Sequence, residues 1–199
     1  IIPIAYEPKN KINEIRDTEN NDLFRVLWLG SVILRKGIQY LMEAARRLSS
    51  SIQIDVVGPV GITDRVVRSA PSNMTFHGRV PRDEVTEWYR RSDVFVLPTL
   101  SDGFAITQLE AMANGLPVIA TPRCGHVVVD GENGVRIPVR DADALADAID
   151  ALAAHPDRLR AMKTKAYDTV QGYHPSKIAD RLLAMSRRRI ETTVLSDNA

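Results

Sequence analysis

Brief apolar runs alternate with longer amphipathic stretches along most of this chain. The apolar runs are rich in Val, Ile and Leu, which is typical of buried strands. They occupy residues 25–29, 52–57, 74–76, 94–97, 117–120 and 135–137. Such alternation is expected when crossover helices cover both faces of a parallel sheet. The pattern therefore predicts the α/β class, with a doubly wound, mainly parallel sheet and helices on both faces.

The amphipathic stretches predict the helices. They cover residues 37–48, 83–91, 105–114 and 142–153, and two more follow toward the C-terminus, the second of them after Pro175. One helix end is marked clearly, because Gly115 supplies a left-handed exit from the third helix and Pro117 cannot continue it.

Both ends of the chain lack this pattern. Residues 1–22 are polar and irregular, and residues 191–199 show no apolar periodicity, so we expect both segments to be mobile and to carry no chemistry. The domain itself is predicted at residues 23–190. Residues 1–8 lack an initiator Met and read as an extended connector entering from an upstream part. We therefore expect an excised domain, with residues 1–22 as the interdomain connector.

The composition fits one soluble domain of ordinary size. Of 199 residues, 44% are hydrophobic and 26% are charged, which allows one real core and no second one. The formal net charge of +1 gives no global field for nucleic acid, so no such partner is expected. Arg187, Arg188 and Arg189 close the last predicted helix. They fit a solvated, dipole-matched helix end, and a contact with a membrane surface or a partner is the alternative.

Cysteine and histidine usage argues against disulfides and metal sites. Cys124 is the one cysteine, so no intramolecular disulfide forms, and a reducing compartment is expected. The four histidines lack the close spacing of a zinc site, so we expect no structural metal. No run of about 18 apolar residues and no leader-like segment occurs. We therefore expect a cytoplasmic location.

The first candidate for chemistry is the junction after residues 25–29. In an open parallel sheet, ligands gather at the carboxyl ends of the strands, where helix N-termini favour anions. Here Gly30 ends the strand, and the basic pair Arg35 and Lys36 stands at the start of a helix. That arrangement suits a phosphate. The same stretch is also typical of an ordinary strand-to-helix loop with a surface lysine.

The second candidate is the junction at residues 98–110, again directly after an apolar run. Asp102 falls in the loop, and with a helix start near Phe104, Glu110 lies about two turns into the helix. Both carboxylates can accept hydrogen bonds from one elongated ligand whose phosphates face the helix N-terminus, as a carboxylate does for the ribose in dinucleotide sites. The alternative makes Asp102 a helix cap and Glu110 a solvated position.

Three further loops are weaker candidates. Residues 57–61 either let backbone approach a base or form a plain turn. His77 precedes residues 78–80, whose backbone can read a nucleobase, although a satisfied structural histidine is the more common case. His126 lies in another such loop without an argument for a base, and nothing in the sequence makes Cys124 a nucleophile.

Taken together, these loops resemble the C-terminal domain of GT4 retaining glycosyltransferases, one half of the GT-B fold. In that family a Lys-Gly junction is followed by two carboxylates separated by seven residues and by the run Glu-Ala-Met-Ala-x-Gly-x-Pro-Val-Ile-Ala-Thr. Here that run is residues 110–121. Segments that agree in order and spacing are residues 57–59, 76–80, 92–98 and 130–134, and the resemblance covers residues 24–185.

The resemblance implies a Rossmann-like domain that binds a nucleotide-sugar donor, with Lys36 near the diphosphate, Glu110 on the ribose and Asp102 near the sugar. A lysine and a helix N-terminus stabilise the charge on the departing diphosphate, so no metal and no cofactor is implied. Residues 78–80 belong to the part that seats the base, and residues 103–106 to the part along the phosphates and sugar. The other donor-binding residues implied are Gly30, Ser31, Arg35, Gly58, Arg79, Val80, Gly103, Phe104, Ala105 and Ile106.

Departures from the family pattern bear on which sugar the donor carries. Ser31 stands where arginine is common, so that phosphate contact is missing or falls to Arg35. Asp102 replaces a glutamate, Ala105 replaces a glycine, and the loop after Thr121 is short. The resemblance also implies an N-terminal Rossmann domain that binds the acceptor and closes over the donor. Because catalysis needs both walls, we expect this chain alone to be inactive.

Retaining transfer from a nucleotide-sugar is thus the leading hypothesis. The alternatives are another GT-B enzyme, such as a nucleotide-sugar epimerase or a phosphorylase-like enzyme, and a non-catalytic nucleotide-binding module. A dehydrogenase is disfavoured because no Gly-x-Gly-x-x-Gly follows a strand, and a receiver-type domain because the first strand ends without acidic residues.

Overall fold

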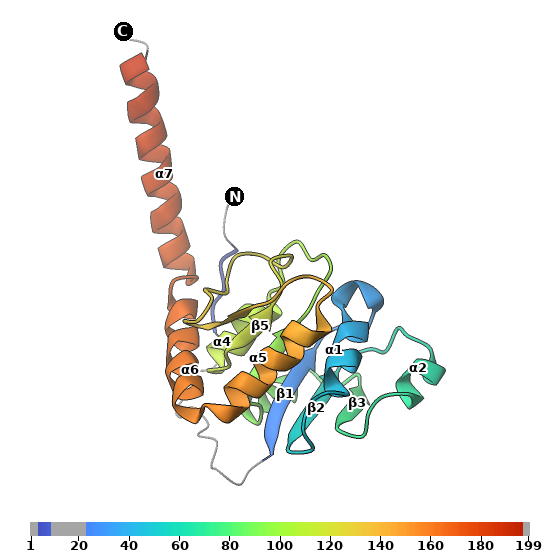
Figure 1. Ribbon diagram of the computed structural model, residues 1–199. Coiled ribbons are helices and arrows are strands. Elements are labelled where there is room, and N and C mark those ends of the chain that lie inside the picture. Colours follow the sequence, from blue (N-terminus) through green and yellow to red (C-terminus); the bar gives the residue numbers. More distant parts are fainter. Residues whose placement is uncertain (1–3, 9–22, 197–199) are drawn as a thin grey trace.

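In the described part of the chain, six parallel strands form a sheet at the centre of the computed structural model (Figure 1). The structure describes residues 4–8 and 23–196, except for the side chains of residues 187–196. The strands lie in the spatial order β3-β2-β1-β4-β5-β6, and every neighbouring pair is parallel. This confirms the doubly wound α/β class. The strands are β1 Phe24–Leu29, β2 Ile52–Val57, β3 Met74–Gly78, β4 Val94–Leu97, β5 Val118–Ala120 and β6 Gly134–Arg136.

Helices cover both faces of the sheet (Figure 1). Side chains alternate along each strand, so that Val26 and Trp28 of β1 belong to one core and Leu27 to the other. Helices α1 and α5 pack over the first core, α3 and α4 pack over the second, and α6 contributes to both. The helices are a 3-10 turn η1 Leu34–Lys36, α1 Ile38–Ala45, α2 Asp64–Arg68, α3 Val85–Arg90, α4 Thr107–Ala113, α5 Ala142–Ala154, α6 Pro156–Gln171 and α7 Pro175–Ser196.

The structure differs from the predicted elements mainly where helices start. Helix α4 begins at Thr107, later than predicted, and η1 precedes α1 as a separate turn. Gly37 lies between η1 and α1 with a φ of 86°, and an added Cβ there would come 1.9 Å from the carbonyl oxygen of Pro98. Only glycine fits this left-handed position and close approach. The sequence pattern does not indicate α2, because a helix of five residues is too short to show a helical period.

The C-terminal helix α7 projects away from the body of the domain (Figure 1). It continues through Ser196, past the boundary at residue 190 where we placed the start of a flexible tail. The side chains of Arg187, Arg188 and Arg189 lie outside the described residues, so both interpretations of that triplet stay open. None of the described helices combines the length and the apolar character that crossing a bilayer requires.

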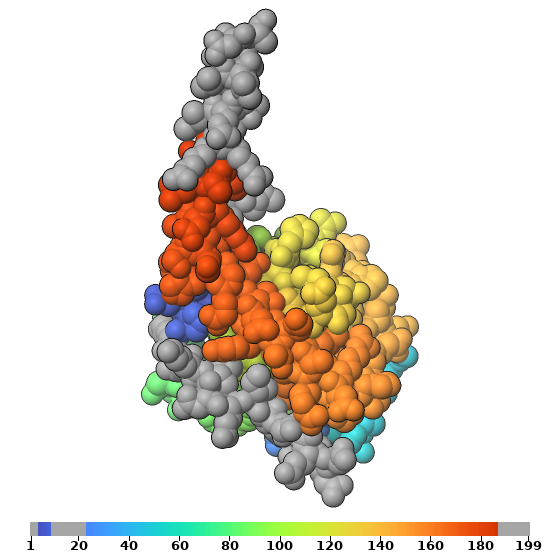
Figure 2. Space-filling model, turned by 90° about the vertical axis from the view of Figure 1, so that its left-hand side faces the viewer, coloured from blue at the N-terminus to red at the C-terminus, as the bar shows by residue number. Residues whose placement is uncertain are grey.

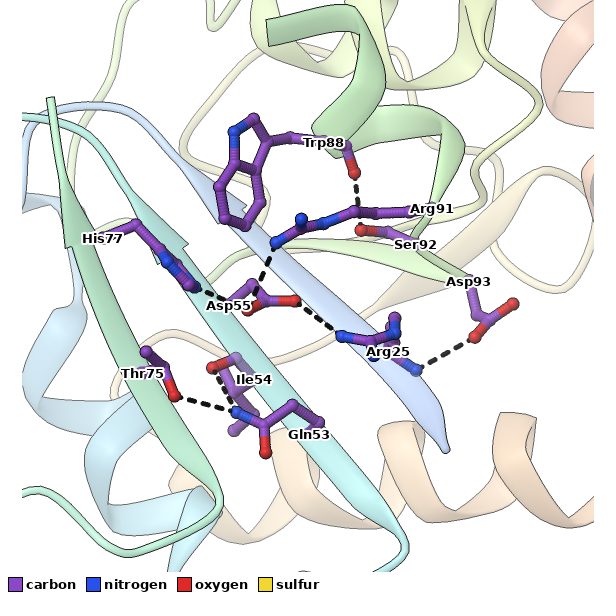
Figure 3. Close-up of polar contacts among 10 residues, drawn as sticks. All are labelled: Arg25, Gln53, Ile54, Asp55, Thr75, His77, Trp88, Arg91, Ser92 and Asp93. Carbon is purple, nitrogen blue, oxygen red and sulfur yellow. Dashed lines mark hydrogen bonds and ion pairs between the residues drawn. The ribbon is translucent and has the colours of Figure 1, made fainter. Parts of the chain in front are cut away.

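A polar cluster fastens α3 to the sheet (Figure 3). Asp55 on β2 is 3% exposed, and its Oδ1 lies 2.6 Å from His77 Nε2 and 3.7 Å from Arg91 Nη2. Its Oδ2 lies 3.4 Å from Arg25 Nη1. The Arg91 guanidinium also stacks on the ring of Trp88, 3.3 Å from its centroid. Because these side chains come from three strands and from α3 and its C-terminal end, the cluster fixes the helix relative to the strands.

Candidate functional site

The loops after β1 and β4 are joined at the carboxyl edge of the sheet. Strands β1 and β4 are neighbours at the point where the strand order reverses, which is where open α/β sheets bind ligands. The N–H of Leu100 donates to the Arg35 carbonyl oxygen at 2.9 Å, and the Thr99 hydroxyl donates to the same oxygen at 3.2 Å. The Arg35 guanidinium donates to the Ser101 carbonyl oxygen at 2.5 Å. These bonds lock one candidate loop onto the other.

Lys36 and Asp102 meet at this junction. The Lys36 ammonium pairs with Oδ2 of Asp102, and the two side chains are 21% and 16% exposed. Lys36 is therefore not a free surface lysine. The interpretation of Asp102 as a helix cap is wrong, because Ile106 is the N-cap of α4 and no side chain caps that helix. The N–H of Asp102 instead donates to the Arg123 carbonyl oxygen at 2.7 Å.

The loop after β5 packs against the loop after β4 and holds it by hydrogen bonds. Ala105 is buried, and its N–H donates to the Cys124 carbonyl oxygen at 3.2 Å. The Gln108 side-chain amide donates to the same oxygen at 2.6 Å. Gly125, with a φ of 96°, lies so close to the Phe104 ring that an added Cβ would come within 2.8 Å of it. The alanine that replaces the family's glycine at position 105 thus points into the core, and its N–H bonds to protein.

Glu110 projects from the first turn of α4, one turn earlier than predicted, because the helix begins later. The hydroxyl of Tyr89, on α3, donates a hydrogen bond to Glu110 Oε2 at 3.0 Å. The interpretation of Glu110 as a solvated helix position is therefore wrong. Its carboxylate is held between two helices.

Glu110 lines a cavity of about 270 Å³ between α3 and α4. The far wall is residues 6–8, a segment distant in sequence, and the N–H of Tyr6 donates to the Tyr173 carbonyl oxygen at 2.8 Å. Figure 2 shows this segment, in blue, against the C-terminal helices. We expected no chemistry from residues 1–22, yet three of them lie beside a candidate site residue. On α3 and before it, the lining residues are Arg82, Val85, Thr86 and Tyr89.

Burial and the Glu110 carboxylate raise the pKa of both tyrosines. The pKa of Tyr6 rises to about 12, first because the phenol is buried and then because a tyrosinate would face the negative charge of Glu110. The same causes, together with the hydrogen bond to Glu110, hold the pKa of Tyr89 well above its ordinary range. Both phenols therefore stay protonated at neutral pH, and the hydroxyl of Tyr89 keeps the proton that it donates to Glu110.

The structure divides the predicted site residues between two places. Lys36, Arg35 and Asp102 lie together at the loop junction, whereas Glu110 and Ile106 line the cavity. Among the described residues, no hydrogen bond or ion pair joins the first group to Glu110.

Gly30, Gly58 and Gly78 lie where β1, β2 and β3 end, beside the loop junction. Gly78 also begins residues 78–80, the segment expected to seat the base. Gly58 has a φ of 137°, and an added Cβ would lie 2.0 Å from the Gly30 carbonyl oxygen, so these two glycines pack backbone against backbone. The N–H of Gly58 donates to the Gly78 carbonyl oxygen at 2.8 Å. Ser31, Gly103 and Arg79 are exposed, and Val80 packs against the second core.

Two weaker candidates have structural roles. His77 is paired with Asp55, as expected of a satisfied histidine. Cys124 is fully buried, and burial, with the nearby Asp102 charge as a lesser cause, raises the pKa of its thiol to about 12, so it is no nucleophile. Within residues 4–8 and 23–186, no three His, Cys, Asp or Glu side chains are placed to hold a metal ion.

Sequence reasoning missed Tyr89 and Tyr6. Tyr89 stands in a helix next to Trp88, where two aromatics predict core packing rather than a hydrogen bond to a site carboxylate. Tyr6 lies in a stretch without periodicity, so no sequence signal places it near Glu110, more than one hundred residues away along the chain. Both contacts depend on tertiary packing.

The sequence has relatives among known glycosyltransferases. Residues 24–155 match the family described as Glycosyl transferases group 1. A D-inositol 3-phosphate glycosyltransferase 1 of Catenulispora acidiphila is 31% identical over 190 residues, which is 86% of this chain and 46% of that protein. The chain thus spans less than half the length of this relative.

Solved structures agree with this relationship. Sucrose-phosphate synthase from Thermosynechococcus elongatus superposes with a TM-score of 0.77 at 26% identity, over 96% of this chain and 52% of that one. Alr3699/HepE of Anabaena, solved in complex with UDP, has the same fold, with a TM-score of 0.70 at 16% identity over 84% of this chain and 49% of that one. The fold is that of one Rossmann-like domain of the GT-B glycosyltransferases. This chain belongs to the group 1 family of glycosyl transferases.

Proposed function

We propose that this chain is the donor-binding domain of an enzyme that transfers a sugar from a nucleotide-sugar to an acceptor, with retention of configuration and without a metal ion. The observation that carries the proposal is the contact of Lys36 with Asp102, where the β1 and β4 loops meet at the reversal of strand order. The structure of Alr3699/HepE with UDP, on the same fold, supports a nucleoside diphosphate as part of the ligand.

Lys36 binds the diphosphate in this proposal. Lys36 is the last residue of η1 and only Gly37 separates it from α1, so a positive charge and the partial charge of a helix N-terminus act on the same anion. Both stabilise the negative charge that grows on the diphosphate as the sugar leaves. This contribution replaces the one that a divalent cation makes in other transferases.

Asp102 and Glu110 bind the two ends of the donor. Asp102 accepts hydrogen bonds from hydroxyls of the sugar at the loop junction, and Glu110 accepts them from the ribose in the cavity between α3 and α4. Ile106 connects the two places, because it ends the β4 loop and lines the cavity. An extended nucleotide-sugar that runs along the start of α4 satisfies both carboxylates.

The transfer step needs a second wall. The chain spans less than half of its relative's length, and an N-terminal domain that binds the acceptor and closes over the donor would supply the missing face. We therefore expect nucleotide binding by this chain and sugar transfer only by a protein that contains both halves.

Isothermal titration calorimetry in the presence of EDTA tests the donor site. UDP, GDP and ADP are titrated into the 199-residue chain, and one of them is expected to bind with a Kd between about 10 μM and 1 mM, which corresponds to about 4 to 7 kcal/mol. If all three nucleotides and their sugars fail to bind at millimolar concentration, both with EDTA and with Mg²⁺ in its place, the donor-site proposal is wrong. Binding that requires Mg²⁺ would contradict metal independence alone.

A further inference from the structure

The cavity wall carries a residue whose role follows from its contact with Glu110, and the inference rests on the proposed function. We propose that Tyr89 is a positioning residue: it holds Glu110 by one carboxylate oxygen so that the other oxygen is presented to the ribose hydroxyls of the donor.

The contact divides the carboxylate into two unequal oxygens. Oε2 of Glu110 accepts the Tyr89 hydroxyl at 3.0 Å. Among the described residues, none donates a hydrogen bond to Oε1, and the Glu110 side chain lines the cavity. Oε1 therefore keeps its capacity to accept hydrogen bonds, while Oε2 fixes the rotation of the group.

Tyr89 is itself held firmly. Its ring is almost fully buried and lies 6.0 Å from the ring of Phe95 on β4, tilted by 57°. Helix α3, which carries Tyr89, is fastened to the sheet: Arg91 at its C-terminal end pairs with Asp55 and stacks on the ring of the neighbouring Trp88 (Figure 3). A rigid hydroxyl restricts the rotamers of an otherwise flexible glutamate, so less conformational entropy is lost when a ligand binds.

Calorimetry of the 199-residue chain with UDP and with 2′,3′-dideoxy-UDP tests the role. In Tyr89→Phe the ring packing remains and the hydrogen bond is lost, so the Kd for UDP is expected to rise about three- to tenfold. The Kd for the dideoxy ligand should stay within about twofold, because that ligand lacks the hydroxyls that Glu110 binds. Tyr167→Phe, on α6 and outside the cavity lining, is the matched control and should change neither value.

Three additional variants separate positioning from other causes. Glu110→Ala should lose affinity for UDP alone, and Tyr89→Phe in the Glu110→Ala background should add nothing. Glu110→Asp withdraws the carboxylate from both the Tyr89 hydroxyl and the ribose, so it should repeat the selective loss and tests the ribose role, while the double variant tests the positioning role.

The outcomes distinguish this inference from the proposed function. Equal losses for both ligands in Tyr89→Phe would show a merely structural tyrosine and overturn the inference. A selective loss in Glu110→Ala without one in Tyr89→Phe would overturn the positioning role and leave the ribose role of Glu110 intact. If UDP does not bind, GDP or ADP is used instead, each together with its 2′,3′-dideoxy analogue. Binding by none of them, or no selectivity in Glu110→Ala, would reject the ribose site and the inference together.

Discussion

Lys36 and Asp102 form an ion pair that connects two loops from opposite sides of the point where the strand order reverses. Both residues are expected to bind the donor, one through its phosphates and the other through its sugar. Because the two side chains pair with each other, a ligand phosphate that binds Lys36 has to displace the Asp102 carboxylate. The ion pair therefore weakens ligand binding slightly, and it orients both side chains before the ligand binds.

The first prediction follows from this competition. Asp102→Asn removes the carboxylate that competes for Lys36, so the 199-residue chain should bind UDP about two- to fivefold more tightly, as expected for a partly exposed pair worth up to about 1 kcal/mol. Calorimetry measures the change. Weaker UDP binding would show instead that Asp102 helps to hold Lys36 in place.

The second prediction concerns the sugar. In the proposed two-domain enzyme, Asp102→Asn should reduce transfer by about tenfold or more, because one charge-assisted hydrogen bond to a sugar hydroxyl is weakened. Asp102→Glu should change the preference among donor sugars, since the carboxylate reaches one methylene further. A panel of nucleotide-sugars assayed on all three proteins checks this. Unchanged rates and preferences would remove Asp102 from the sugar site.

The third prediction is that Lys36→Ala reduces transfer by the proposed two-domain enzyme about a hundredfold, which corresponds to about 2 to 3 kcal/mol of lost transition-state stabilisation. The melting temperature should change little, since the pair with Asp102 is partly exposed. Lys165→Ala, an exposed lysine on α6, is the control. Normal turnover in Lys36→Ala would show that this lysine only pairs with Asp102 and does not act on the donor.

The fourth prediction concerns the thiol of Cys124. Burial raises its pKa to about 12 from an ordinary value of 9.0, so at pH 8 the folded chain should react with iodoacetamide about a thousandfold more slowly than the urea-unfolded chain. The raised pKa also means that the thiol's contribution to stability is complete below pH 9 and is lost as the pH rises toward 12. Mass spectrometry of the alkylated protein measures the rate, and fast alkylation without urea would contradict the buried position.

The fifth prediction concerns stability away from the site. Asp55→Ala leaves Arg25, His77 and Arg91 without their shared carboxylate and should lower the free energy of unfolding by about 2 kcal/mol, less than for a fully buried pair because the partners are about one-third exposed. Asp147→Ala, on an exposed face of α5, should change it by less than about 0.5 kcal/mol. Urea denaturation measures both, and equal effects would show that the cluster does not hold α3.

The chain pattern alone determined the fold class and most element positions. Residues 52–57 and 94–97 were predicted with the bounds that the structure has, because Val, Ile and Leu dominate both segments, as is typical of strands buried in a parallel sheet. Helix starts were less certain, since the backbone around residues 103–106 is shaped by the β5 loop and not by its own periodicity.

The same division holds for the site. Spacing and residue type singled out Lys36, Asp102 and Glu110, because the carboxyl ends of parallel strands are where ligands bind. Only the tertiary structure decided that Lys36 pairs with Asp102, that Tyr89 holds Glu110, and that Tyr6 closes the cavity beside it. Each of these contacts joins side chains far apart along the chain, and local hydrophobic periodicity carries no information about which distant side chains meet. The sequence therefore predicted where on the sheet a ligand is expected, and packing determined which side chains contact one another there.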